Sequence, residues 1–470
     1  MKHGDLIEVQ IDSLGFEGVS VARHDGKVVF VDGALPGERV IANVRKARRK
    51  HTEANLESIL EASPHRVKPP CTHFADCGGC SWQQLDYAEQ LNWKSRHVAD
   101  SFERLGKIPY GHIKPILGSP TQWNYRNKME FSFGTRRWMT VAEINSGNEI
   151  ERSNFALGLH APGRYDAILH IDDCMIQHPH GNEILAMIRR EAQQRGISAY
   201  NTHEHLGFLR NLSVRSTIAT NELMIILLTN EPASANEEEF AAWFTSGFAE
   251  EAPYVTTLIH AVNGTRSPVA VGEIRTIHGS GYITEELYGV KFRISPFSFF
   301  QTNPYQLPNF LDATFAAANI QPTDTVWDLY CGTGSISLPA ATKARHVAGV
   351  ELVESSIADA QANAERNGIT NTEFHCTDLH KPAALDFLHT LPAPDVVIVD
   401  PPRAGIHEQT LRLIMEIAPP VISYVSCNPA TQARDCAILS EYYSVDYLQP
   451  LDMFPHSYHI ENVARLVRKG

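Results

Sequence analysis

The last third of the chain alternates short apolar runs with segments of helical pattern, and this alternation constrains the fold most. The runs are nearly continuous, as expected for strands buried on both faces, so they predict a parallel, doubly wound sheet with helices on both sides. Two final runs have no long helix between them and predict an antiparallel edge. The predicted strands read TVWDLYC, HVAGVEL, TEFHCTD, DVVIVDPP and VISYVSCNP, and the final two VDYLQPLDMF and NVARLVR.

The first two strand ends carry the residues of a nucleotide-type site, because ligands of such sheets bind beyond the carboxyl ends of the strands. The first strand runs into Asp328-Leu-Tyr330-Cys-Gly-Thr-Gly-Ser335, where the glycines let the backbone approach a ligand. The second ends at Glu351, which can accept hydrogen bonds from ribose hydroxyls. The third glycine of a dinucleotide fingerprint is absent, since position 337 is Ser. The pattern favours adenosylmethionine, with a NAD-type site or a plain tight turn as alternatives.

The third and fourth strands end in aspartates. Asp378 is placed to contact the adenine side of a cofactor, or else to cap a helix. Asp400 is followed by Pro401-Pro402-Arg403, and two prolines after an apolar strand predict a rigid loop that holds the carboxylate at the sheet edge.

The fifth strand ends at Cys427, followed by Asn-Pro. A thiolate there can attack an electrophilic carbon held beside the cofactor. The alternative, a buried core cysteine, explains the residue type but not the Asn-Pro that follows. Further on, His456, His459 and Glu461 are candidates for acid–base chemistry, and an ordinary edge strand is an equally good interpretation of that segment.

The N-terminal part of the chain has a different pattern. Residues 4–60 alternate short β-type runs with Gly and Asp turns and predict a small closed barrel, followed by a Pro-rich linker at 63–70. The net charge of −13 argues against nucleic acid, but residues 45–50, RKARRK, hold five cations in six positions. Because binding depends on local patches, this run is either an RNA contact or a solvated face.

Three of the eight cysteines form a C-x5-C-x2-C cluster at Cys71, Cys77 and Cys80, and Cys174 follows about a hundred residues later. Four thiolates suit either zinc or an iron–sulfur cluster, and the spacing does not decide between them. The chain has no run of 18 apolar residues and no leader-like N-terminus, so no transmembrane helix and a cytoplasmic location are expected.

Together these motifs resemble the RNA 5-methyluridine methyltransferases, whose ribosomal branch carries an N-terminal TRAM domain. Residues 4–40 resemble the TRAM barrel, and CTHFADCGGC with Cys174 resembles that branch's four-cysteine iron–sulfur site. The later family motifs occur in the expected order: ISPFSFFQTNP, DLYCGTGSISL, DPPRAG, VSCNP and FPHSYHIE.

The resemblance implies a residue for each role. It implies cofactor contacts at Gln301, Tyr330, Glu351 and Asp400, with Cys427 as nucleophile and Glu461 as base. It extends the cofactor contacts to Asp378 and to Ser335, which stands where many members have Asn. It implies a [4Fe-4S] cluster on Cys71, Cys77, Cys80 and Cys174.

The resemblance also implies an architecture and a substrate. The expected fold is α/β: a TRAM, OB-like barrel at 1–62, a central α+β domain with the iron–sulfur site at 70–285, and a Rossmann-like class I methyltransferase domain at 290–470. The expected substrate is a uridine of large-subunit ribosomal RNA, favoured over transfer RNA. Independently of the resemblance, the protein is expected to act as a monomer, because the RNA would have to wrap both barrel and cleft. Two rival functions are cytosine-5 methylation, which commonly uses a Pro-Cys nucleophile at the fourth strand, and RNA binding without catalysis.

Overall fold

The N-terminal barrel closes because its first strand pairs on both sides. The structure is a computed structural model that describes residues 1–147, 154–164, 166–267 and 269–470. Ile7, Val9 and Ile11 point inward and alternate with exposed residues, and β1 pairs with both β2 and β4, which leaves no free edge. The predicted closed barrel is confirmed. Its strands are β1 (Leu6–Leu14), β2 (Ser20–His24), β3 (Lys27–Asp32), β4 (Arg39–Ala47) and β5 (His51–Glu61).

The cationic run 45–50 covers the end of β4 and the turn into β5. Arg45 and Arg48 both form ion pairs with Glu53, at 3.4 and 3.2 Å. Arg49 and Lys50 are exposed at the turn. Part of the positive charge is thus balanced by the barrel's own carboxylates, and the turn itself remains cationic.

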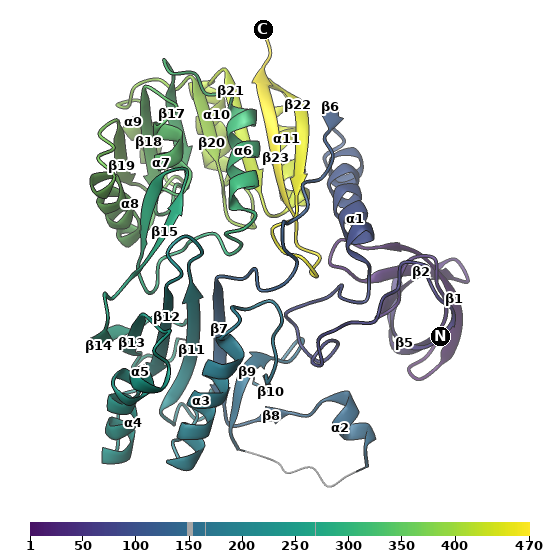
Figure 1. The fold of residues 1–470 in the computed structure, drawn as a ribbon. Helices are drawn as coiled ribbons and strands as arrows, with labels where there is room; N and C mark the ends of the chain where they lie inside the picture. Colours follow the sequence, from purple (N-terminus) through teal and green to yellow (C-terminus); the bar gives the residue numbers. More distant parts are fainter. Residues whose placement is uncertain (148–153, 165, 268) are drawn as a thin grey trace.

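The central sheet lies below the C-terminal sheet in Figure 1 and has helices packed on its apolar face. Its strand order is β14-β13-β12-β11-β7-β9-β10-β8. The strands are β7 (Lys128–Gly134), β8 (Arg137–Trp138), β9 (Ala156–His160), β10 (Ile168–His170), β11 (Leu209–Ser216), β12 (Leu223–Thr229), β13 (Thr257–Val262) and β14 (Glu273–His278). The helices are α2 (Val141–Asn145), α3 (Gly181–Gln194), α4 (Ala235–Thr245) and α5 (Gly247–Glu251). A separate hairpin, β15 (Ile283–Leu287) and β16 (Val290–Ile294), follows.

The C-terminal sheet confirms the predicted doubly wound fold. Its order is β19-β18-β17-β20-β21-β23-β22-β6; the first five strands are parallel and β23 runs antiparallel to both neighbours. Apolar cores fill both faces. The strands are β17 (Thr325–Leu329), β18 (His346–Glu351), β19 (Thr372–Cys376), β20 (Val396–Val399), β21 (Val421–Ser426), β22 (Tyr443–Leu451) and β23 (Glu461–Arg468). The helices are α6 (Leu307–Ala318), α7 (Ser337–Ala341), α8 (Glu354–Arg366), α9 (Ala383–Leu388), α10 (Glu408–Ile417) and α11 (Pro429–Leu439).

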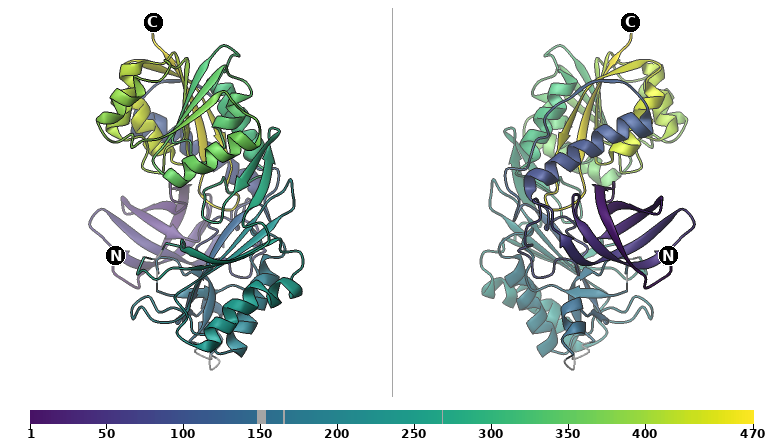
Figure 2. Two further views of the ribbon diagram at one scale, coloured as in Figure 1. Left: turned by 90° about the vertical axis from the view of Figure 1, so that its left-hand side faces the viewer. Right: turned by 90° about the vertical axis from the view of Figure 1, so that its right-hand side faces the viewer.

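One segment from the N-terminal half belongs to the C-terminal sheet. Helix α1 (Tyr87–Asp100), the π-helical segment η1 (Ser101–Gly106) and strand β6 (Tyr110–Ile113) follow one another, and β6 pairs with β22 as the outermost strand. Figure 2 shows α1 lying along this sheet, above the barrel. The sheets therefore do not follow the predicted division at residues 70–285 and 290–470 strictly, and those boundaries stay predictions. Within the described ranges, no helix is both long and apolar enough to cross a lipid bilayer.

Candidate active site

Five predicted site residues lie at one edge of the C-terminal sheet because the strands that carry them are in register. β17 pairs with β18 and β20, and β20 pairs with β21, all parallel. Their carboxyl ends therefore meet, which brings Tyr330, Glu351, Asp400 and Cys427 to a common edge. β23 runs the opposite way against β21, so its first residue, Glu461, begins at that same edge.

The loop after β17 wraps around the carboxylate of Glu351. Tyr330 and Gly332 have positive φ values of 68° and 54°, which turn the backbone back toward β18. Glu351 accepts hydrogen bonds from the backbone N–H of Gly332 at 3.2 Å, of Leu352 at 2.8 Å and of Val353 at 3.0 Å. These bonds fix the orientation of the carboxylate and leave lone pairs for a ligand's hydroxyls.

A fully buried carboxyl, Asp328, lies beneath this loop and was assigned no role from the sequence. Its carboxyl accepts a hydrogen bond from the Ser337 hydroxyl. Burial, reinforced by the charges of Asp400 and Glu351, raises the pKa of Asp328 to about 7. The sequence signal for this role is a single acidic residue inside an otherwise apolar strand. Asp328 ties the start of α7 to β17 and so supports the glycine loop from below.

Gln301 reaches the sheet edge from outside the sheet. Its side-chain amide donates a hydrogen bond to Asp400 Oδ2 at 3.4 Å, while its backbone oxygen accepts one from the Asn127 side chain at 2.9 Å. Asn127 directly precedes β7, so the central sheet helps to place Gln301. Burial raises the pKa of Asp400 to about 7. The structure thus brings Gln301 and Asp400 together, and their contact with a cofactor stays a prediction.

Cys427 is half-buried among two acidic groups and one cation. Burial, followed by the charges of Glu461 and Asp400, raises the pKa of its thiol to about 12, and the Arg403 guanidinium opposes that rise. Burial also raises the pKa of Glu461 well above its usual range; Asp400 adds to this rise and Arg403 again opposes it. The Cys427 thiol is therefore protonated at neutral pH, and the surroundings of Glu461 favour its uncharged form. Arg403 is the site residue that the sequence analysis named only as part of a rigid loop.

The Asn-Pro pair after Cys427 has a structural reason, which corrects the expectation that a core cysteine would leave it unexplained. Asn428 is the N-cap of α11, and its side chain accepts from the Ala430 N–H at 3.1 Å. Pro429 takes the first helical position, where proline is favoured. The Asn428 amide also donates to the Arg403 carbonyl at 3.2 Å, which joins the Asp-Pro-Pro-Arg loop to the start of α11.

The two candidate histidines are uncharged at neutral pH. Burial lowers the pKa of His456 and of His459 to about 4. The His456 ring stacks on Trp123 with 3.9 Å between ring centroids, and its Nδ1 lies 3.2 Å from the Gln90 amide nitrogen. The His459 ring lies 3.5 Å from the guanidinium of Arg403. His456 is thus packed into a structural network, whereas His459 adjoins Arg403 beside Cys427 and Glu461.

Asp378 and Ser335 are less closely tied to the other site residues. The Asp378 carboxylate accepts from the His380 N–H at 3.0 Å and pairs with Lys381 at 3.5 Å. These bonds lower its pKa and belong to a turn, because the N-cap of the following helix, α9, is Pro382; the alternative that Asp378 caps a helix is therefore wrong. Ser335 is half-buried in the glycine loop. Their roles as cofactor contacts stay predictions.

The four clustered cysteines, distant in sequence, line one cavity between the loop 71–83 and the segment 171–176. All four are free thiols. Thiols of this number are the donor set of an iron–sulfur cluster or of structural zinc, so the residues fit either group. Among the described residues, however, no three His, Cys, Asp or Glu side chains are arranged to hold a metal ion. The predicted metal ligands therefore line one cavity, but their side chains are not arranged as the ligands of a metal ion.

Comparison with known proteins agrees with this arrangement. Residues 277–381 and 386–469 match the tRNA (uracil-5-)-methyltransferase family, and residues 1–56 match the TRAM domain. An uncharacterized RNA methyltransferase of Chlorobaculum tepidum is 38% identical over 468 residues, which cover 98% of this chain and 96% of that protein. An uncharacterized RNA methyltransferase of Porphyromonas gingivalis is 39% identical over 469 residues, covering 98% and 99%.

A solved structure extends the likeness to the whole fold. The tRNA (uracil-54, C5)-methyltransferase of Pyrococcus abyssi, in complex with S-adenosyl-L-homocysteine, matches with a TM-score of 0.75 and 27% identity, over 98% of this chain and 100% of that one. This chain belongs to the tRNA (uracil-5-)-methyltransferase family of RNA methyltransferases and carries an N-terminal TRAM domain. It is an S-adenosylmethionine-dependent enzyme that acts on RNA.

Proposed function

We propose that the protein transfers the methyl group of S-adenosylmethionine to C5 of a uridine in large-subunit ribosomal RNA. The observation that carries this proposal is the cluster of Cys427, Glu461 and Asp400 at one sheet edge, beside the glycine loop 330–335. Methylation at uracil C5 needs a nucleophile that adds to C6 and a base that later removes the C5 proton. The Cys427 thiol can supply the nucleophile and the Glu461 carboxyl group the base, and the two groups lie close enough to interact electrostatically.

The chemistry assigns one step to each residue. Cys427 loses its thiol proton to solvent and adds to C6 as the thiolate, and the electron pair of the C5–C6 double bond moves toward O4 as an enolate, which makes C5 nucleophilic. S-adenosylmethionine supplies the methyl group that C5 takes up. Glu461 then removes the C5 proton, the double bond re-forms, and the thiolate leaves from C6. General-base help of this kind is typically worth about 10²–10⁴-fold in rate.

The electrostatics of the cluster suit these roles. Burial raises the pKa of both Cys427 and Glu461 and so favours their uncharged forms before the substrate arrives. Arg403 favours the ionised form of both. When Glu461 does ionise, its raised pKa makes it a stronger base than an exposed glutamate. The target base must leave its stack to reach C6, so base flipping is expected.

The cofactor is proposed to lie against the glycine loop. Glu351 would take the ribose hydroxyls, and Gln301, Tyr330, Ser335 and Asp400 would contact the rest of the molecule, with Asp378 on the adenine side. Support comes from the common sheet edge and from the solved relative's complex with S-adenosyl-L-homocysteine.

Ribosomal RNA is the favoured substrate because the TRAM barrel and the four cysteines resemble the ribosomal branch. Transfer RNA is the second candidate, and a specific observation favours it. The Pyrococcus abyssi protein named a tRNA (uracil-54, C5)-methyltransferase aligns over its full length with nearly the whole of this chain, so this architecture also occurs in an enzyme named for transfer RNA.

The experiment uses labelled S-adenosylmethionine with unmodified ribosomal RNA and unmodified transfer RNA in separate reactions. Labelled 5-methyluridine in ribosomal RNA, absent with Cys427→Ala but present with Cys376→Ala, supports the proposal. Cys376 is a matched control because it also ends a strand of this sheet but is exposed. Label in transfer RNA alone would mean that the substrate is transfer RNA and that the methylation chemistry is as proposed. Labelled 5-methylcytidine, or RNA binding without transfer, would establish one of the rival functions instead.

We also propose a [4Fe-4S] cluster on Cys71, Cys77, Cys80 and Cys174, with zinc as the alternative. The shared cavity and the four-thiol donor set support it. When bound, the group would tie the 71–80 loop to the strand-end segment at Cys174. Iron and acid-labile sulfide are expected in anaerobically purified protein and should be absent from Cys174→Ser. Zinc without sulfide would favour the alternative, and no bound metal would contradict both.

A further inference from the structure

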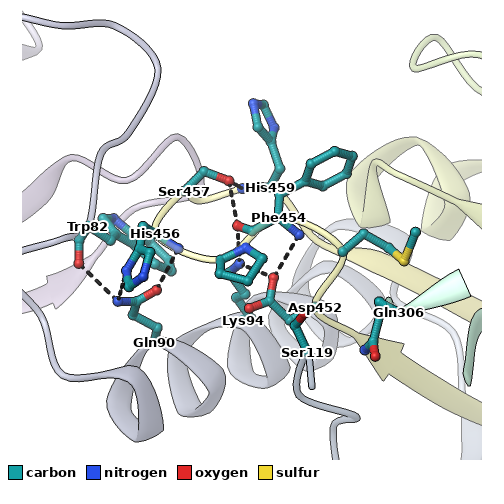
Figure 3. Close-up of polar contacts among 12 residues, drawn as sticks. Trp82, Gln90, Lys94, Ser119, Gln306, Asp452, Phe454, His456, Ser457 and His459 are labelled. Carbon is teal, nitrogen blue, oxygen red and sulfur yellow. Dashed lines mark hydrogen bonds and ion pairs between the residues drawn. The ribbon is translucent and has the colours of Figure 1, made fainter. Parts of the chain in front are cut away.

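The loop that leads to the catalytic base is held by side chains from a distant part of the chain. Residues 452–460 connect β22 to β23, and Glu461 is the first residue of β23. Glu461 pairs with Leu451, the residue just before the loop, so both loop ends lie together. Figure 3 shows this loop facing the side chains of α1.

The first contact that fixes the loop is a buried ion pair. Lys94 Nζ lies 2.6 Å from Asp452 Oδ1, and both side chains are fully buried. Lys94 also donates to the Phe454 carbonyl at 3.0 Å, and the Tyr87 hydroxyl donates to Asp452 Oδ2 at 2.9 Å. Because a buried ion pair often contributes little to stability against an apolar replacement, its presence calls for another reason.

The second contact that fixes the loop involves His456. The Gln90 side chain accepts from the His456 N–H at 3.0 Å, and its amide nitrogen lies 3.2 Å from His456 Nδ1. The N–H groups of Ser81 and Trp82 both donate to the His456 carbonyl, at 2.9 and 3.0 Å. His456 has a φ of 65°, a strained conformation for a residue with a side chain, which persists only where the surroundings fix it.

Helix α1 has polar residues on its buried face. Its buried face includes Gln90, Lys94 and His97, at positions where a packed helix usually carries apolar residues. Gln90 and Lys94 each bond the loop directly, 366 and 358 residues away in the chain. Gln90 and Lys94 therefore serve the 452–460 loop, whereas His97 contacts the barrel.

We propose that Lys94 and Gln90 are positioning residues, which hold the 452–460 loop in the conformation that aims Glu461 at the C5 proton. This inference rests on the proposed function. It predicts which step fails when the hold is removed. In that step Glu461 takes the C5 proton, the C5–H electrons form the C5–C6 double bond, and the C6–S bond breaks with its electron pair returning to Cys427. Cys427 lies just after β21, outside the loop, so the earlier addition and methyl transfer are spared.

The test is Lys94→Met, compared with wild type and with Glu461→Gln. The methylated RNA should remain bonded to the enzyme, as a complex that survives a denaturing gel, as in Glu461→Gln. Turnover should fall about 100-fold, the cost expected when a catalytic group is misplaced by roughly 1 Å. The affinity for S-adenosyl-L-homocysteine should be unchanged. Lys107→Met, which removes an exposed lysine just after η1, is the matched control and should turn over like wild type.

A second variant separates positioning from stability. Lys94→Met leaves Asp452 as an unpaired buried charge, which destabilises the fold. Lys94→Met combined with Asp452→Asn removes that charge and should recover melting temperature. If the pair positions the loop, the covalent complex still accumulates in the double variant. If the pair only stabilises the fold, turnover recovers with the melting temperature, and that result overturns the inference.

Three further results would contradict the inference in distinguishable ways. A Lys94→Met variant that turns over like the wild type overturns the inference but not the proposed function. So does a Lys94→Met variant that binds S-adenosyl-L-homocysteine but no longer forms the covalent complex. A wild-type protein that forms neither 5-methyluridine nor a covalent complex overturns the proposed function and the inference together.

Discussion

At the scale of single residues, burial favours the uncharged forms of the acidic groups around Cys427. Three acidic groups, Cys427, Glu461 and Asp400, lie near one cation, Arg403, and burial raises the pKa of each acid. A ligand that brings positive charge to this cluster should draw protons out of it. The cluster is therefore sensitive to the charge of whatever binds beside it.

The first prediction follows from Asp400, whose pKa is raised to about 7. A cationic cofactor binds better to the ionised carboxylate, so S-adenosylmethionine affinity should rise with pH up to about 7 and level off above it. Below that pH the slope should approach tenfold for each pH unit. S-adenosyl-L-homocysteine lacks the sulfonium charge and should show a weaker dependence. Calorimetric titration from about pH 5.5 to about pH 8.5, a range that brackets a pKa near 7, measures both ligands.

The control for this prediction is Asp400→Asn, which keeps the shape of the side chain and removes its titration. Its S-adenosylmethionine affinity should be lower than that of wild type at about pH 8 but nearly independent of pH across the range. A pH dependence that survives in Asp400→Asn would assign the titration to another group.

At the scale of elements, parallel register explains why the sheet-edge residues could be predicted. Once the strands align, each strand end falls at the same edge, so Glu351, Asp400 and Cys427 come together without any knowledge of side-chain contacts. Arg403 could not be assigned its role this way, because it follows two prolines in a loop whose direction is set by Asn428.

The second prediction concerns the glycine loop. Gly334 has a φ of 82°, and an added Cβ would lie 3.3 Å from Leu338 and 3.4 Å from Ala360. Gly334→Ala should cost about 1–2 kcal/mol of stability from the left-handed backbone alone. It should also weaken S-adenosyl-L-homocysteine binding, because the loop must shift against α7 and α8.

Gly368→Ala is the matched control for this variant. Gly368 has a φ of 63° with open space around it, just beyond the end of α8. It should lose similar stability in chemical denaturation while keeping the ligand affinity of wild type. An equal decrease of affinity in both variants would show that general destabilisation, not the loop, governs binding.

At the scale of the whole molecule, the C-terminal sheet lies above the central sheet, and the barrel lies to one side next to α1 (Figure 1). Asn127 from the central sheet places Gln301, and the barrel contacts α1 through the His97 ring, which lies 3.1 Å from the Leu14 carbonyl oxygen. The chain is acidic overall, at −13, so its attraction for RNA must come from local cationic surfaces such as the β4–β5 turn.

The third prediction tests that turn. Arg49→Glu with Lys50→Glu should raise the RNA concentration needed for half-maximal rate and leave the rate at saturating RNA nearly unchanged. The salt dependence of binding should fall by about one in slope for each RNA phosphate that the variant no longer neutralises. Arg190→Glu with Arg195→Glu, at helix α3 and its C-cap, makes the same change in net charge as a control. An equal effect from both pairs would mean that net charge, not the turn, governs RNA binding.

Long-range pairing is the part of the molecule that the sequence could not reveal. The barrel and the doubly wound sheet have repeating local patterns, and both were predicted. Strand β6 is short and pairs with β22, which lies far away in the chain. Lys94 and Asp452 are individually ordinary polar residues, and only the fold shows that they meet with both side chains fully buried. Neither contact leaves a periodic or spaced signal in the chain.

The most direct measurement is covalent trapping on RNA that carries 5-fluorouridine at the methylated position. Fluorine cannot leave C5 as a proton does, so the reaction should stop after methyl transfer with the RNA still attached to the enzyme. Mass spectrometry of the digested complex should place the attachment on the peptide that contains Cys427, and only when S-adenosylmethionine is present. Attachment at another residue, or methylation of ordinary RNA without any trapped complex on the fluorinated one, would contradict the covalent mechanism.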